Sequence, residues 1–434
     1  MNKQTGNKKA MTLGAAVAIG IGGMVGGGIY SLLGAAVSVA GNAVYLSFAL
    51  AGLVALFSAY SYAKLGARYP SAGGPVEFLI QGFGDGIVSG GFNVLLWIGY
   101  VFALALYARA FGAYLSTFFP GLPGYWQNVF ATLIVLAFTA VNFLGSKAVG
   151  RSELVIVAAN VGFLLLFAGA GFFFLKPSLL SPAHWPHVNK VLFAAGVVFL
   201  TYEGFGLVTN TAEDMENPQE TLPKALYLSV GIVIFLYIAV SVAVVGNLAV
   251  PKIMAASDYA AAAAAQAFLG PWGLRLVAFA ALFATASAIN ATLYGGANVS
   301  YTIAKDGELP EIFERKVWGR SREGLFITAA LVVLFANVFN LDRIGMMGSA
   351  AFLLIYAAVS IGHLRLYRET GARRWVIVAA ILACLSSFGI LTYYLWTTTP
   401  VTLGVLLAVV ASSFAIEWLY RAITHRRINT RVRQ

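Results

Sequence analysis

Residues Ala18–Gly34 read AIGIGGMVGGGIYSLLG, an apolar run in which six glycines fall between positions 20 and 28. Each glycine inside a helix costs about 1 kcal/mol relative to alanine, so the three successive glycines at 26–28 favour backbone that is not helical. If the run crosses a membrane, lipid cannot hydrate such backbone, which survives only where it lines a cavity or meets a ligand. The alternative explanation is close packing, because small residues let membrane helices approach each other.

The composition of the whole chain indicates a membrane protein. Of its 434 residues, 60% are hydrophobic and 10% are charged, and the mean hydropathy is +0.82, whereas a soluble domain carries about 25% charged residues. The apolar residues form blocks long enough to cross a bilayer as helices, without the short alternating segments of a membrane β-barrel. We therefore predict an all-α polytopic membrane protein with twelve transmembrane helices, at 12–36, 41–66, 87–117, 126–144, 152–175, 190–212, 222–248, 272–303, 324–341, 344–366, 375–397 and 400–420.

The basic residues predict how this chain is oriented. With both termini in the cytoplasm, 22 of the 28 lysines and arginines fall in cytoplasmic segments, as the positive-inside rule requires. An odd number of spans would destroy this bias. The formal net charge of +11 is then explained by topology and by attraction to anionic lipid, not by nucleic acid. We expect a multi-pass protein of the cell membrane.

A second glycine-containing run lies in the sixth predicted span. It reads VVFLTYEGFGLVTN (Val197–Asn210) and places Gly204 and Gly206 close to Glu203. If spans 1–5 and 6–10 form two equivalent halves, each half opens with a glycine-rich span. Interruptions at corresponding positions of two halves point to the binding site of a transporter. The two halves are inferred here from the helix count and the positions of the breaks, not from residue identity.

The two breaks would present complementary backbone groups to a solute. Amide groups at the start of the outer half of the first span, with the helix dipole, suit a carboxylate. Carbonyl groups that end the inner halves accept hydrogen bonds from an ammonium group, and the two groups together describe an α-amino acid. Aromatic side chains near the second break could either gate the solute or simply pack. The predicted substrate-binding residues are Met24, Gly26, Gly27, Gly28, Phe199, Leu200, Tyr202 and Glu203.

Several motifs resemble those of the amino acid–polyamine–organocation (APC) superfamily, most closely its prokaryotic amino acid transporters of broad specificity. The resemblance implies the LeuT fold, a 5+5 inverted repeat with broken helices 1 and 6 and two peripheral helices, working by alternating access. It also implies a transport core over 1–370, with helices 11 and 12 and a basic cytoplasmic tail over 371–434, and neutral amino acids as substrates. The motifs are GGMVGGGIY (Gly22–Tyr30), YPSAGGP (Tyr69–Pro75), NFLGSKAVGR (Asn142–Arg151), TYEGFGLVTN (Thr201–Asn210), ENPQETLPKA (Glu216–Ala225) and NATLYGGANVSYTIAKDGELPE (Asn290–Glu311).

The resemblance further implies a coupling proton carried by a lysine of the fifth helix, but Asn160 occupies that position here and asparagine cannot titrate. Three alternatives follow. Glu203 could carry the proton, because an intramembrane carboxyl group is expensive and is a functional hypothesis by default. Sodium could bind through the Gly22 carbonyl and the hydroxyls of Thr285 and Ser287, or the protein could be an uncoupled facilitator or exchanger. We favour Glu203, and therefore a secondary transporter that carries out proton symport.

Each of these residues also has a simpler explanation. Glu203 could select cationic amino acids, or could be a protonated acid bonded to unwound backbone. Asn160 could make an ordinary interhelical hydrogen bond, and the hydroxyls of Thr285 and Ser287 could bond to their own helix.

Other classes of protein fit the sequence less well. The four histidines and the single cysteine, Cys384, offer neither a nucleophile–base pair nor paired histidine ligands. We therefore expect neither an enzyme nor a metal or other cofactor. A channel would show a repeated filter or rings of charge, whereas paired broken helices suit a carrier.

Overall fold

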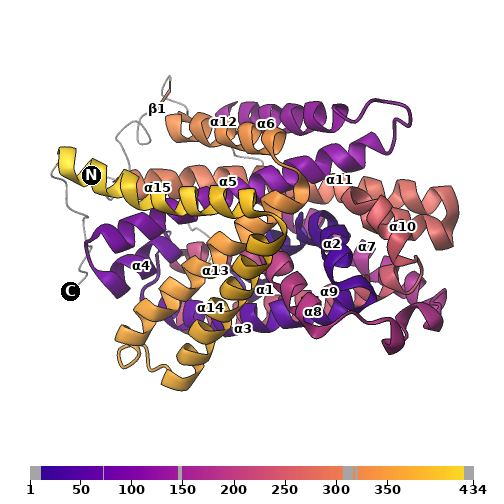
Figure 1. The fold of residues 1–434 in the computed structure, drawn as a ribbon. Helices are drawn as coiled ribbons and strands as arrows, with labels where there is room; N and C mark the ends of the chain where they lie inside the picture. The colour runs from indigo at the N-terminus through magenta and orange to yellow at the C-terminus, as the bar shows by residue number, and fades with distance from the viewer. Residues whose placement is uncertain (1–10, 72, 145–148, 306–315, 318–320, 425–434) are drawn as a thin grey trace.

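The computed structural model describes residues 11–71, 73–144, 149–305, 316–317 and 321–424 (Figure 1). Its α-helices are α1 (Leu13–Val25), α2 (Gly28–Ala40), α3 (Val44–Arg68), α4 (Pro75–Phe83), α5 (Ile87–Ser116), α6 (Trp126–Leu144), α7 (Val149–Phe173), α8 (Val188–Val198), α9 (Pro218–Val245), α10 (Val250–Ala255), α11 (Ala260–Lys305), α12 (Glu323–Val338), α13 (Leu341–Leu366), α14 (Arg374–Thr398) and α15 (Pro400–Thr424). The 3-10 helices are η1 (Gly41–Ala43), η2 (Pro177–Leu180), η3 (Pro182–His184), η4 (Phe199–Asp214) and η5 (Ser257–Tyr259). The strands β1 (Lys316–Val317) and β2 (Ser321–Arg322) form one short antiparallel pair.

The predicted class, a helical polytopic membrane protein, is confirmed. Ten stretches of the described chain are long and apolar enough to cross a bilayer, and two further apolar helices, Leu13–Val25 and Gly324–Val338, are shorter. Each of the twelve predicted spans overlaps one of these segments. The first two predicted spans partly merge, because η1 joins α2 directly to α3. The count of twelve membrane spans therefore stays a prediction.

The helices divide into a buried group and a lipid-facing group. In the most apolar window of α13, 89% of the residues are buried, and in that of α5 78% are buried, whereas the value for α14 and α15 is 28%. The broken helix α1–α2 and η4 lie among the buried helices: α1 packs against η4 and α9, while α3 and α13 pack against η4. The C-terminal helices α14 and α15 lie against α13 and α5 at the edge of the bundle (Figure 1). This arrangement fits peripheral helices, while a boundary at residue 370 stays a prediction.

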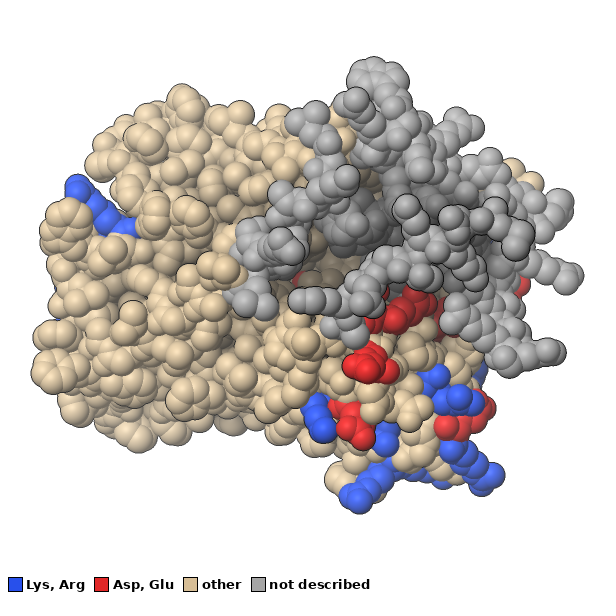
Figure 2. All heavy atoms as spheres, turned by 180° about the vertical axis from the view of Figure 1, so that it is seen from behind, with Lys and Arg blue, Asp and Glu red and all other residues tan. Residues whose placement is uncertain are grey.

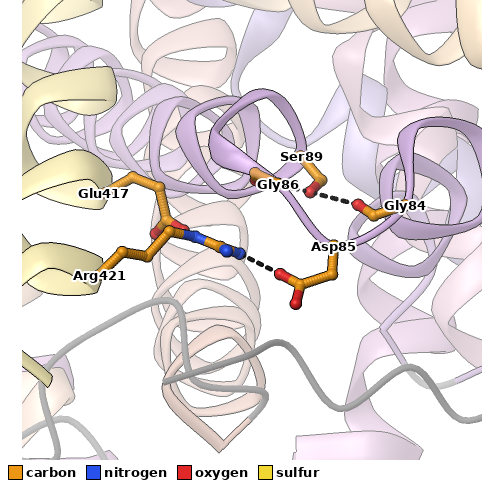
Figure 3. Close-up of polar contacts among 6 residues, drawn as sticks. All are labelled: Gly84, Asp85, Gly86, Ser89, Glu417 and Arg421. Atoms are coloured by element: carbon orange, nitrogen blue, oxygen red, sulfur yellow. Dashed lines mark hydrogen bonds and ion pairs between the residues drawn. The ribbon is translucent and has the colours of Figure 1, made fainter. Parts of the chain in front are cut away.

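Charged side chains gather at one end of the molecule (Figure 2). We call it the charged end; it holds α4, the C-terminus of α13 and the last turn of α15 (Figure 1). Two side-chain contacts join separate segments of this end: the Tyr69 hydroxyl donates to Glu369 at 2.8 Å, and Arg421 of α15 pairs with Asp85, which follows α4 (Figure 3). Arg421 also pairs with Glu417 of its own helix.

The start of α1 lies at the charged end too. The Met11 amide donates to the carbonyl of Asp214 at the end of η4, and η4 packs against α4. The first and last described helices therefore begin and end on the same side, as an even number of spans requires. The predicted basic tail lies outside the described residues from 425 onward.

Candidate functional site

The break predicted in the first span is confirmed. The helix α1 ends at Val25, where the Gly26 amide donates to the Gly22 carbonyl at 2.9 Å. The helix α2 begins at Gly28, and its first turn is closed by the Ser31 amide, which donates to the Gly27 carbonyl at 3.1 Å. The first four amides of a helix have no partner inside it, and no side chain caps this terminus. The start of α2 therefore has the donors that an anionic group needs.

Close packing also requires these glycines. The non-helical break and the close approach of neighbouring helices therefore both explain why glycine stands here. A Cβ atom on Gly23 would lie 2.8 Å from the carbonyl oxygen of Gly204 in η4. A Cβ atom on Gly27 would lie 2.2 Å from the ring of Tyr107, which covers the break from α5. The two interrupted segments are therefore in direct backbone contact.

The second break differs from the predicted unwound segment. After α8 ends at Val198, the chain continues as the 3-10 helix η4 for 16 residues, from Phe199 to Asp214. Runs of 3-10 helix longer than three or four residues are uncommon, and often mark a hinge or a strained segment. The backbone of the sixth span is tightened where we predicted that it would be uncoiled. The reason lies in its contacts: the Leu200 amide donates to Ser349 on α13 at 2.9 Å, and the Glu203 carbonyl accepts from the hydroxyl of Tyr356, also on α13, at 2.8 Å.

The 3-10 geometry decides which side chains of η4 share a face. Residues three apart eclipse one another in a 3-10 helix, so Thr201, Gly204 and Leu207 form one face, and this face contacts Gly23 and Gly28 of the first span. Glu203 shares a different face with Gly206. A Cβ atom on Gly206 would lie 3.6 Å from Tyr62 on α3 and 3.7 Å from the Tyr356 hydroxyl. Glu203 therefore points toward α3, α5 and α13.

The carboxyl group of Glu203 is buried without a hydrogen-bond partner. The residue is 2% exposed, and neither carboxyl oxygen makes a hydrogen bond within the described part of the chain. The Tyr107 hydroxyl is a close neighbour of the carboxyl group, but the two groups do not meet the geometric criteria of a hydrogen bond. Because an unpaired buried charge is very costly, the position suits a group that exchanges a proton or takes a cationic partner.

The carbonyl groups predicted to be free have partners, so that part of the prediction is wrong. The Tyr237 hydroxyl, on α9, lies 2.6 Å from the carbonyl oxygen of Met24 and 3.1 Å from that of Thr201. It thereby connects the end of α1 to η4. The carbonyl of Glu203 is occupied by Tyr356. Since a carbonyl oxygen has two lone pairs, each of these groups can still accept a hydrogen bond from an ammonium group.

Three of the predicted coupling residues lie together. Gly22, Asn160 and Ser287 line one cavity of about 30 Å³, between α1, α7 and α11. A volume of this size holds one or two water molecules and is too small for an amino acid. Thr285 is not among the lining residues; its hydroxyl donates to the Ala281 carbonyl of its own helix at 2.7 Å.

Asn160 binds the break in the first span through both ends of its amide. Its Oδ1 accepts from the Tyr30 hydroxyl at 2.9 Å, and its Nδ2 lies 3.5 Å from the carbonyl oxygen of Val25. Val25 is the last residue of α1. Asn160 is therefore an uncharged hydrogen-bonding partner on both sides of the break.

Comparison with known proteins identifies the family of the chain. The sequence matches the amino acid permease family over residues 11–416. The chain belongs to this family. The permease is 42% identical over 425 residues to an uncharacterized protein of Methanocaldococcus jannaschii, covering 97% of both chains. It is 34% identical over 400 residues to the inner membrane transport protein YbaT of Escherichia coli (92% of this chain, 93% of that one). It is 28% identical over 364 residues to the methylthioribose transporter of Bacillus subtilis (79% and 78%). The resemblance to APC transporters is thereby confirmed, and amino acid transport is the function that the family supports.

The aromatic residues of η4 pack in this conformation of the permease. The ring of Phe199 lies 5.7 Å from that of Tyr356, and the Tyr202 hydroxyl donates to the Phe48 carbonyl on α3 at 2.9 Å. These contacts hold η4 against its neighbours. The sequence did not reveal Tyr107 and Tyr237, which cover the first break and connect it to η4. Both tyrosines lie in long apolar runs of predicted spans. The only sign in the sequence that they could have a special role is their hydroxyl group within such a run.

Proposed function

We propose that this permease is a proton-coupled symporter of neutral amino acids that works by alternating access. The single observation that carries the proposal is the unpaired carboxyl group of Glu203, buried beside two interrupted helices that contact each other. The charged end would face the cytoplasm of the cell, since basic residues favour that side.

The proposed substrate site lies over the break in the first span. The substrate carboxylate would accept hydrogen bonds from the amides of Gly27 and Gly28 at the start of α2, where the helix dipole favours negative charge. The Gly26 amide, which we also predicted for this role, is bonded to the Gly22 carbonyl. The ammonium group would use the second lone pair of the Met24 carbonyl, next to Tyr237. Glu203 is the acidic side chain nearest to this site on η4, and a neutral amino acid leaves it free to carry a proton.

A proton fits the coupling role better than sodium. The Asn160 amide already donates toward the Val25 carbonyl, and the Thr285 hydroxyl bonds to its own helix. Of the three oxygen ligands expected for sodium, Thr285 lies outside the small cavity, so the cavity offers a cation fewer oxygen atoms than we expected. Two alternatives remain as outcomes of the test below: an uncoupled facilitator or exchanger, and a transporter in which Glu203 binds a cationic side chain.

The proposed architecture is the inverted repeat of helices 1–5 and 6–10. The interruption after α1 and the change of helix type after α8 both occur in the first span of a five-span group, which supports this division. The low burial of α14 and α15 supports placing them outside the transport core of residues 1–370.

The test is amino acid uptake into proteoliposomes under imposed pH or sodium gradients. A pH gradient should drive accumulation of neutral amino acids and a sodium gradient should not. Glu203→Gln should abolish the accumulation while leaving counterflow of labelled against unlabelled substrate. Glu77→Gln is the matched control, because Glu77 belongs to α4 at the charged end and bonds to Gln81. Accumulation that follows sodium, or that survives Glu203→Gln, would overturn the proposal.

A further inference from the structure

Buried polar side chains lead from Glu203 toward the charged end. The first are Tyr62 on α3 and Tyr356 on α13, whose rings lie 5.1 Å apart. Both hydroxyls are close enough to Glu203 to interact with it electrostatically. Tyr62 is fully buried, and its hydroxyl has no hydrogen-bond partner among the residues that the structure describes.

The next polar groups are Ser360, one helical turn farther along α13, and Ser61, beside Tyr62 on α3. The Ser360 hydroxyl of α13 donates to Ser61 of α3 at 3.4 Å, and both residues are completely buried. Ser360 follows Tyr356 by four residues, so the two side chains share one face of α13. Ser61 directly precedes Tyr62. The two helices therefore bring hydroxyl groups together inside an otherwise apolar bundle.

His363 continues the series on α13. It is completely buried, and its Nε2 lies 2.9 Å from the Thr370 hydroxyl. That hydroxyl has acceptors of its own, the carbonyls of Leu366 and Tyr367 at 3.2 and 3.3 Å. When the Thr370 proton points to one of these carbonyls, Nε2–H donates to Thr370 and Nδ1 keeps a free lone pair. Nδ1 has no partner within the described chain.

The far end of the series reaches the charged end. Thr370 belongs to the turn that follows α13 and is only partly buried. Lys64, on α3, is the charged side chain that interacts electrostatically with His363. Around Glu203 the titratable neighbours are phenols: Tyr62 on α3, Tyr100 and Tyr107 on α5, and Tyr356 on α13.

A purely structural interface would look different. Buried polar atoms in proteins are nearly always hydrogen-bonded, and yet three side chains along this one interface keep unpaired atoms: Glu203, Tyr62 and His363. A chain of proton transfers needs, at each member, a lone pair that can receive a proton and a proton that can be released. The unpaired atoms of these three side chains leave such positions open to a bridging water.

We propose that the α3–α13 interface is the proton path between Glu203 and the charged end, with His363 as the last proton acceptor inside the protein. The inference rests on the proposed function, in which Glu203 carries the coupling proton. Tyr356 and Ser360 lie one turn apart on α13, about 5.4 Å along the helix axis, and a bridging water between their hydroxyls would complete the path. The proton leaves the Glu203 carboxyl group as a carboxylate forms, each hydroxyl or water accepts one proton and donates another, and His363 Nδ1 accepts the last. The resulting imidazolium returns its proton to the solution at the charged end.

The test separates net proton release from substrate exchange. Purified protein in liposomes that contain a pH-sensitive dye is given an amino acid gradient, and proton flux is recorded beside counterflow. Tyr62→Phe and His363→Gln should each reduce proton flux and proton-driven accumulation severalfold, while counterflow persists because exchange needs no net proton release. Matched controls are Tyr45→Phe, at the other end of α3, and Ser241→Ala, a buried hydroxyl of α9 bonded to its own helix; both should behave as the unaltered protein.

The outcomes distinguish this inference from the proposed function. If Glu203→Gln stops proton flux but Tyr62→Phe and His363→Gln do not, the path is wrong and the symporter stands. If Glu203→Gln also leaves proton flux intact, the proposed proton symport itself is overturned, and the path with it. If the two path variants lose counterflow together with proton flux, the side chains are structural and the path is again overturned.

Discussion

The contact between the two interrupted segments makes Gly204→Ala a direct test of the proposed site. A Cβ atom on Gly204 would lie 2.1 Å from the carbonyl carbon of Gly23, 2.3 Å from its oxygen and 2.5 Å from the amide nitrogen of Met24, whereas ordinary contact begins at 3.4 Å. The obstacle is backbone, so no side chain can rotate away. Relief requires that η4 and α1 separate by at least about 1.3 Å, the difference between 3.4 and 2.1 Å. Overpacking of this kind costs about 1–3 kcal/mol.

The assay for Gly204→Ala combines stability with transport. Thermal unfolding of the purified permease in detergent should show a lower midpoint, and uptake should fall because the substrate groups on α1 and η4 move apart. Gly162→Ala is the matched control: this glycine lies in α7 with nothing within 4 Å of the added atom, and alanine favours a helix by about 1 kcal/mol. Equal unfolding midpoints and equal uptake for the two variants would refute the close approach of the two segments.

Three other variants test separate parts of the structure. Tyr237→Phe removes the hydroxyl between α1 and η4; it should cost about 1 kcal/mol of stability and raise the KM for uptake, and an unchanged KM would place Tyr237 outside the substrate site. Asn160→Ala removes the bonds to Tyr30 and Val25; it should slow transport without creating dependence on sodium, which flux in sodium-free buffer checks. Arg421→Ala leaves the buried Glu417 unpaired and should destabilise the protein by about 3 kcal/mol. Adding Glu417→Gln should recover part of that loss in thermal unfolding, and no recovery would contradict the ion-pair explanation.

The break in the first span could be predicted because its cause is local. Three successive glycines at 26–28 weaken a helix regardless of what surrounds them, and α2 does begin at Gly28. The resemblance to a known family led us to expect Gly22, Thr285 and Ser287 as a sodium site, with Asn160 in the place of a coupling lysine. Gly22, Asn160 and Ser287 line one cavity, whereas Thr285 does not. The transport roles of these residues remain proposals.

The form of the sixth span could not be predicted, because its neighbours determine it. Ser349 and Tyr356 bind backbone groups of η4 from α13, and both are about 150 residues away in the sequence. The contact of Tyr237 with the first break could not be predicted for the same reason. The chain has 20 tyrosines, and nothing in the local sequence of this one indicates that its hydroxyl reaches Met24.

The long 3-10 helix gives the permease a segment whose length can change. A 3-10 helix rises about 2.0 Å per residue and an α-helix about 1.5 Å, so conversion of the 16 residues of η4 to α-helix would shorten the segment by about 8 Å. The end of η4 is fastened to the start of α1 through Met11 and Asp214. A switch of helical type would therefore pull the inner half of the first span along the membrane normal, and would couple opening at one side to rearrangement at the centre.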